Sequence, residues 1–153
     1  MIKQAIIPLA GQGTRLLPLT SVIPKELLPI NGKPGIEYIL DECIKAGIKD
    51  IIFVISKKKE IIKKYFYNDA FYKKITKKKK DLRIIKEYKK ILFYKKRIKF
   101  VYQNKPLGTG DAVLKAMKYI KDDYFLMLLP DDLIIKKNCS KEMIFIHNKY
   151  KSS

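Results

Sequence analysis

The chain has 153 residues, of which 47% are hydrophobic and 32% are charged, and this predicts one globular domain with a core large enough for a sheet covered by helices. Two widely separated cysteines, Cys43 and Cys139, and a single histidine, His147, argue against a disulfide framework or a structural zinc site and favour a reducing cytoplasm. No apolar stretch approaches the roughly 18–20 residues that span a bilayer, so we expect no membrane partner.

The formal net charge of +19 is concentrated in one lysine-rich block, residues 57–99, which holds 19 Lys and Arg against 4 Asp and Glu. Base and phosphate recognition tends to recruit arginine, yet the chain holds 3 arginines beside 31 lysines. Lys, Ile and Tyr are abundant together, as an A/T-rich coding bias would produce. We therefore interpret the block as a solvated helical surface and do not expect nucleic acid as a partner. A basic face that binds RNA or another polyanion is the alternative.

The first elements alternate in the order strand, loop, helix, strand. Residues 4–10, QAIIPLA, predict a buried strand that ends at a glycine turn, although Pro8 lacks a donor for the strand ladder. Residues 35–47 carry apolar side chains at helical spacing, and Gly47 is the expected end of that helix. Residues 50–56, DIIFVIS, predict the second strand. This order indicates the start of a parallel α/β sheet.

The second half of the chain continues the alternation. The lysine-rich block predicts three amphipathic helices, and a strand, a helix opened by a glycine loop, a further strand and a last helix follow it. These elements are expected at about 59–68, 69–79, 81–94, 98–103, 108–120, 124–132 and 141–151. We predict a Rossmann-like open α/β sheet with helices on both faces. Doubly wound sheets more often continue further, so this sheet is expected to be truncated after its fourth main strand.

A glycine loop, GQGTR at residues 11–15, follows the first predicted strand. It is neither a Walker A loop nor a dinucleotide fingerprint, because Leu16 stands where the latter needs its third glycine. In open α/β sheets ligands bind at the carboxyl ends of the strands, where glycines let backbone N–H groups approach a phosphate or a base. Arg15 would add a planar cation suited to pyrophosphate, and four nearby prolines would hold Lys25 in place. A plain Gly-x-Gly turn with an exposed Arg and Lys is the alternative.

Two further loops are expected at the same edge of the sheet. Gln103 ends the third predicted strand, and its amide offers a donor and an acceptor that suit a pyrimidine base edge, unless it merely caps the strand. The glycines at 108–110 open the next helix, as a ligand contact or as a plain helix-entry turn. Asp131 or Asp132 would hold Mg²⁺ together with substrate phosphates, or would cap a helix. Three such loops on one edge favour a ligand site.

Three segments carry a family resemblance: GQGTRLLPLTSVIPKELLPINGKPGIEYILDECIKAGI at residues 11–48, QNKPLGTGDAV at 103–113 and LLPDD at 128–132. In this order they resemble motifs of bacterial UTP–glucose-1-phosphate uridylyltransferases, within the sugar nucleotidyltransferase superfamily. The resemblance implies a nucleotide-diphospho-sugar transferase fold, with residues 1–153 as the nucleotide-binding part and a helical lysine-rich insertion at about 57–97. The family's chain is much longer, so a fragment or a truncated, non-catalytic product is expected.

The resemblance also implies roles for individual residues. Arg15 and Lys25 would be catalytic at the phosphates, and Asp131 would coordinate Mg²⁺. The substrates would be UTP and glucose 1-phosphate, although thymidylyl transfer, the acceptor sugar and a homo-oligomer stay open. Asp111 is a departure, because the family often has His there and a carboxylate would repel phosphates unless it faces away. The residues expected to bind the nucleotide are Ala10, Gly11, Gly13, Thr14, Glu26, Gln103 and Gly108.

Overall fold

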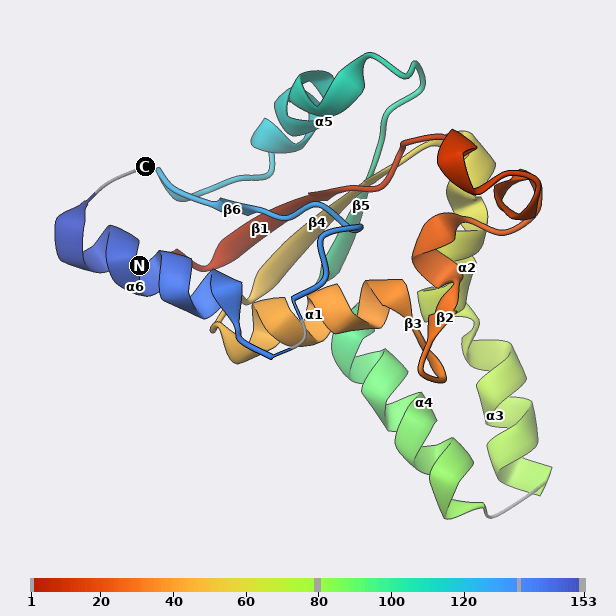
Figure 1. Cartoon of the computed structure of the whole chain (residues 1–153). Coiled ribbons are helices and arrows are strands. Elements are labelled where there is room, and N and C mark those ends of the chain that lie inside the picture. The colour runs from red at the N-terminus through yellow and green to blue at the C-terminus, as the bar shows by residue number, and fades with distance from the viewer. Residues whose placement is uncertain (1, 79–80, 135, 152–153) are drawn as a thin grey trace.

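Four parallel strands form the central sheet of the molecule (Figure 1). The computed structural model describes residues 2–78, 81–134 and 136–151. The order across the sheet is β5-β4-β1-β6. The strands span Gln4–Pro8 (β1), Asp50–Ile55 (β4), Ile98–Tyr102 (β5) and Leu126–Met127 (β6). Strand, helix and strand alternate along the chain, so the predicted parallel α/β sheet is confirmed.

Helices cover both faces of this sheet, as predicted (Figure 1). Along β4, Phe53 points into the larger core, which α1 (Gly35–Lys45), α2 (Glu60–Tyr67), α4 (Leu82–Lys95) and α6 (Cys139–Tyr150) share. Its neighbours Ile52 and Val54 point to the opposite face, where α5 (Gly108–Met117) packs on them. Because side chains alternate between the two faces of a strand and helices cover both faces here, β4 needs an apolar residue at nearly every position.

The lysine-rich block forms a 3-10 turn, η4 (Lys57–Lys59), followed by α2, α3 (Asp69–Lys78) and α4. The three predicted helices are confirmed, although position 79, the expected end of the second, lies outside the described residues. In Figure 1, α3 and α4 extend away from the sheet as a pair. Tyr94 Oη of α4 donates to Asp41 Oδ1 at 2.5 Å, and Tyr65 Oη of α2 donates to Glu37 Oε1 at 2.5 Å. Carboxylates of α1 therefore anchor the block to the sheet.

The connections that sequence patterns left as one long loop have local structure of their own. Three 3-10 turns lie at Thr14–Leu16 (η1), Leu19–Ser21 (η2) and Lys25–Leu27 (η3). A small hairpin, β2 (Pro29–Ile30) and β3 (Lys33–Pro34), follows them. Its turn is Asn31-Gly32, with φ of 49° and 75°, the residue pair that two-residue hairpins favour. Gly47, with φ of 91°, ends α1 as predicted and donates to Ile44 O at 3.0 Å.

The fourth strand is much shorter than the predicted range of 124–132, and that prediction is wrong in its extent. Of residues 124–132, only Leu126 and Met127 pair with β1, and Leu128 N adds one further hydrogen bond to Ile6 O at 3.1 Å. The chain then turns, because Pro130 has no N–H and Asp132 N bonds back to Leu129 O at 3.3 Å. The adjacent aspartates therefore lie beyond the strand. Pro8, by contrast, is tolerated as the last residue of β1.

Within the described ranges, none of the helices combines the length and the apolar character needed to cross a membrane.

Replacing Phe53 with Ala is expected to lower the free energy of unfolding by about 3–5 kcal/mol, because it leaves a cavity in the central strand. Phe53 is 0% exposed, whereas Phe71 on α3 is 55% exposed and supplies the matched control. Urea unfolding followed by circular dichroism measures both variants. A Phe71→Ala effect as large as that of Phe53→Ala would contradict the assignment of the core.

Candidate functional site

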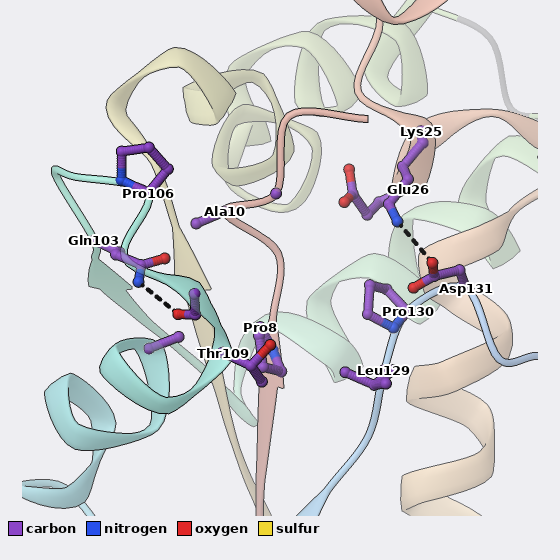
Figure 2. Close-up of a pocket in the computed structure, with 13 residues that line it drawn as sticks. Pro8, Ala10, Lys25, Glu26, Gln103, Pro106, Thr109, Leu129, Pro130 and Asp131 are labelled. Atoms are coloured by element: carbon purple, nitrogen blue, oxygen red, sulfur yellow. Dashed lines mark hydrogen bonds and ion pairs between the residues drawn. The ribbon is translucent and has the colours of Figure 1, made fainter. Parts of the chain in front are cut away.

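A cavity of about 390 Å³ opens at the carboxyl edge of the sheet (Figure 2). Its walls come from the segments that follow β1, β5 and β6, from η3 and from the first turn of α5. Parallel strands bring their carboxyl ends to one edge, so segments far apart in sequence meet here. The lining residues are Pro8, Ala10, Gly11, Lys25, Glu26, Gln103, Pro106, Gly108, Thr109, Ala112, Leu129, Pro130 and Asp131.

Most residues that the sequence singled out as site candidates lie together in this cavity. Those that line it are Ala10, Gly11, Lys25, Glu26, Gln103, Gly108 and Asp131. Arg15 stands at its rim, with a side chain that is 90% exposed. Gly13 and Thr14 form the turn behind the rim, and do not line the cavity. Gly13 adopts φ of 70°, which favours glycine, and its carbonyl accepts from Thr20 Oγ1 at 2.7 Å. That turn sets the position from which Arg15 projects.

Two cations converge on one carboxylate in the segment that follows β6. Lys25 Nζ lies 3.0 Å from Asp131 Oδ2, and Arg15 Nη2 lies 3.7 Å from the same oxygen. The hydrogen bond from Lys25 is the first cause that lowers the pKa of Asp131, so this carboxyl is ionised at neutral pH. Figure 2 shows the Lys25 and Asp131 side chains meeting on one side of the cavity, away from Gln103. A bound polyphosphate would therefore find two positive groups and one anionic group at the same spot.

Gln103 defines the opposite wall of the cavity and is 4% exposed. Its Nε2 donates to Gly108 O at 2.9 Å and to Asp111 Oδ2 at 2.7 Å, which uses both hydrogens of the amide. The amide oxygen lies on the side that faces Ala10 (Figure 2). The side chain therefore presents an acceptor to the cavity, while its donor half orients the amide. Asp111 also pairs with Lys115 at 3.3 Å, and its pKa is lowered chiefly by the bond from Gln103.

Sequence reasoning missed Lys59, which it assigned to a solvated surface. Of the lysines in the described ranges, Lys59 alone is buried, at 7% exposure. Its Nζ lies 2.7 Å from Glu26 Oε1 and 2.9 Å from Oε2. A signal was available, because Lys59 follows β4 at the ligand-binding edge. Three successive lysines share that signal, however, so the sequence could not distinguish the buried one.

A metal ion would have to rely on few protein ligands at this edge. No group of three or more His, Cys, Asp and Glu side chains suited to a metal occurs in residues 2–78, 81–134 and 136–151. Asp131 is the carboxylate that lines the cavity beside the two cations. Such an arrangement suits a hard divalent cation that one or two carboxylates share with substrate phosphates.

These features define an α/β protein of the doubly wound class, with a charged cavity at the carboxyl edge of its sheet. Residues 4–153 match the family model described as nucleotidyl transferase. The chain belongs to this family.

Individual relatives agree with the family assignment. The UTP–glucose-1-phosphate uridylyltransferase of Mycoplasma pneumoniae is 41% identical over 87% of this chain and 45% of its own length. The structure of UTP-bound UGPase from Acinetobacter baumannii superposes with a TM-score of 0.91 at 35% identity, over 99% of this chain and 54% of that one. A structure of UDP-glucose pyrophosphorylase complexed with UDP-glucose has a TM-score of 0.78 at 33% identity, over 99% of this chain and 55% of that one. The chain thus spans about half the length of the curated relatives it matches.

The Lys25→Met variant is expected to raise the pKa of Asp131 toward its usual value of 3.8, because the hydrogen bond that lowers it is lost. NMR titration of the Asp131 side-chain carboxyl carbon measures this. Lys49→Met, an exposed change beside the opposite end of β4, supplies the control and should leave the titration unchanged. An Asp131 pKa that is the same in Lys25→Met and in the unaltered protein would contradict the pairing.

Proposed function

We propose that this chain forms the UTP-binding part of a UTP–glucose-1-phosphate uridylyltransferase, whose reaction gives UDP-glucose and pyrophosphate. The observation that carries the proposal is the cavity itself, in which an acceptor for a base lies across from a pair of cations for phosphates. Relatives with this name and solved structures described with UTP and UDP-glucose support it. Two free cysteines, Cys43 and Cys139, fit a cytoplasmic enzyme.

Gln103 is assigned to recognition of the base. Its oxygen accepts from the N3–H of uracil, because both of its amide hydrogens already serve Gly108 and Asp111. Cytosine presents an acceptor at N3, so it would place two acceptors against each other at this point. Backbone groups at Ala10, Gly11 and Gly108 border the same space and let the nucleoside approach closely. The base is therefore a uracil-type pyrimidine.

Arg15 and Lys25 are assigned to the triphosphate. Both lie beside Asp131, so a polyphosphate held there through a metal ion on Asp131 would be within their reach. Lys25 is the more enclosed of the two, with a side chain that is 21% exposed. Asp131, kept ionised by Lys25, would hold Mg²⁺ against the phosphates. When bound, that ion neutralises phosphate charge. Arg15 and Lys25 provide the same kind of stabilisation from the protein.

The chemical step is a displacement at the α-phosphorus of UTP. A phosphate oxygen of glucose 1-phosphate forms the new P–O bond, and the bond between the α-phosphorus and its bridging oxygen breaks as pyrophosphate leaves. Lys25 and Arg15 stabilise the negative charge that grows on the leaving group. Gln103, on the opposite wall, binds the base and so orients the nucleotide for the displacement. Catalysis therefore comes from positioning and charge, with no covalent intermediate.

Lys25→Ala and Arg15→Ala are each expected to weaken UTP binding in the presence of Mg²⁺ by about 10- to 100-fold, since hydrogen bonds between charged groups contribute about 1.5–3 kcal/mol. Isothermal titration calorimetry measures the affinity. Lys49→Ala is the matched control, because it removes an exposed lysine from the opposite end of the sheet. Affinity that is unchanged in both site variants would overturn the assigned site.

Competition between nucleotides tests the assignment of the base and the sugar. CTP is expected to bind at least about tenfold more weakly than UTP, because a buried acceptor would lose its partner. A single hydrogen bond to the 2′-hydroxyl contributes about 0.5–1.5 kcal/mol, so the affinity for UTP should exceed the affinity for dTTP by about 2- to 10-fold. Displacement of a fluorescent uridine nucleotide measures both ratios. A chain that prefers dTTP would instead be a thymidylyltransferase.

A further inference from the structure

We propose that Lys59 is a positioning residue, which clamps Glu26 and so fixes the turn that carries Lys25 over the cavity. The inference rests on the proposed function for its effect on UTP. The clamp itself is a property of the free protein and can be measured without a ligand. It connects the lysine-rich block, through its first turn, to the phosphate end of the site.

The contact between the two side chains has the geometry of a specific anchor. Lys59 Nζ lies within hydrogen-bond distance of both carboxylate oxygens of Glu26, at 2.7 and 2.9 Å. Glu26 is 3% exposed and Lys59 is 7% exposed, so both charges are largely removed from bulk solvent and depend on each other. Removing one member of a buried pair leaves the other charge uncompensated. Breaking this pair within the folded protein would therefore be costly.

The lysine side of the clamp belongs to the rigid part of the molecule. Lys59 follows β4, a central strand in which Ile51 to Ile55 are all buried. Its own N–H donates to Ser56 O at 2.9 Å and closes the 3-10 turn η4 directly against the strand end. Burial lowers the pKa of Lys59, and the charge of Glu26 opposes that shift. The ammonium group is held at a fixed point of the sheet edge.

The glutamate side belongs to η3, which follows a mostly exposed loop and where the partly buried Leu27 also packs on the larger core. Residues 11–23 are exposed or half-buried throughout, and only at Pro24 and Glu26 does the loop become buried. Glu26 directly follows Lys25 within η3, and Leu28 N bonds to Lys25 O at 3.2 Å. A tether at Glu26 thus limits how far Lys25 can move. Lys25 in turn places its ammonium 3.0 Å from Asp131.

The placement of charge also explains why a lysine serves this purpose. Lys59 pairs with Glu26, whereas Lys25 and Arg15 pair with Asp131. The charges of Lys25 and Asp131 both act on Lys59. If Glu26 were free, it would compete with phosphates for Lys25 one residue away. Engaged by Lys59, its charge is neutralised, and Lys25 stays available for the ligand.

Hydrogen exchange of the free protein tests the clamp directly. Lys59→Met should raise amide exchange at residues 25–28 by about tenfold or more, while β4 amides keep their protection, because local opening requires less free energy than global unfolding. Lys59→Arg should restore most of the protection, and Lys58→Met, on the exposed side of the same turn, should match the unaltered protein. If Lys59→Met melts below the working temperature, the charge-neutral double variant K59M/E26Q replaces it. Unchanged exchange at 25–28 would overturn the proposal.

A double-mutant cycle separates positioning from a general loss of stability. In the Lys59→Met background, adding Lys25→Ala should weaken UTP binding by less than about threefold, because Lys25 is no longer held in place. This is less than the effect of Lys25→Ala in the unaltered protein, as expected for two coupled sites. Full additivity of the two changes would overturn the proposal. An unaltered chain that fails to bind UTP would overturn the proposed function alone, since the exchange experiment still decides the clamp.

Discussion

The parallel pairing of β1 with β4 is the constraint on which the rest of the structure depends. Because Ile6 pairs with Ile52 in register, both strands end at the same edge, and the segments that follow them must meet there. β5 and β6 join on either side in the same direction, which adds Gln103 and Asp131 to that edge. The cavity is therefore a consequence of strand direction. An antiparallel neighbour at either position would have sent its loop to the other end of the molecule.

Charge within the cavity is balanced rather than simply positive. Asp131 stands between Lys25 and Arg15, while Glu26 is neutralised by Lys59. Each carboxylate gives a cation a partner within the protein, and a ligand must therefore compete with that carboxylate for the cation. This arrangement suits a polyanion that arrives with its own divalent cation, because the cation offsets part of the negative charge that is placed beside Asp131. Of the other 29 lysines in the chain, eight lie on the helices α3 and α4.

The carboxylates of α1 give a second role to buried charge. Glu37 accepts from Tyr65 and pairs with Lys90, and Asp41 accepts from Tyr94 and pairs with Lys33. These contacts attach α2 and α4 to the helix that packs on the sheet. The lysine-rich block therefore contacts the rest of the domain at two places: α1 contacts α2 and α4, and Lys59 contacts Glu26. Its helices are thus more than a surface feature, although their apolar stripe alone would predict no more than packing.

By itself, the sequence determined the elements whose patterns are local. Apolar runs identified β1 and β4, helical spacing identified α1, and Gly47 marked its end, because these signals depend only on neighbouring residues. The Asn31-Gly32 turn was equally readable and was overlooked. The tertiary structure alone decided that β6 stops at Met127 and that Lys59, among three consecutive lysines, is buried. The length of β6 depends on how far β1 offers it backbone partners, and the burial of Lys59 depends on the carboxylate of Glu26. In both cases the partner is distant in sequence, so local patterns could not reveal it.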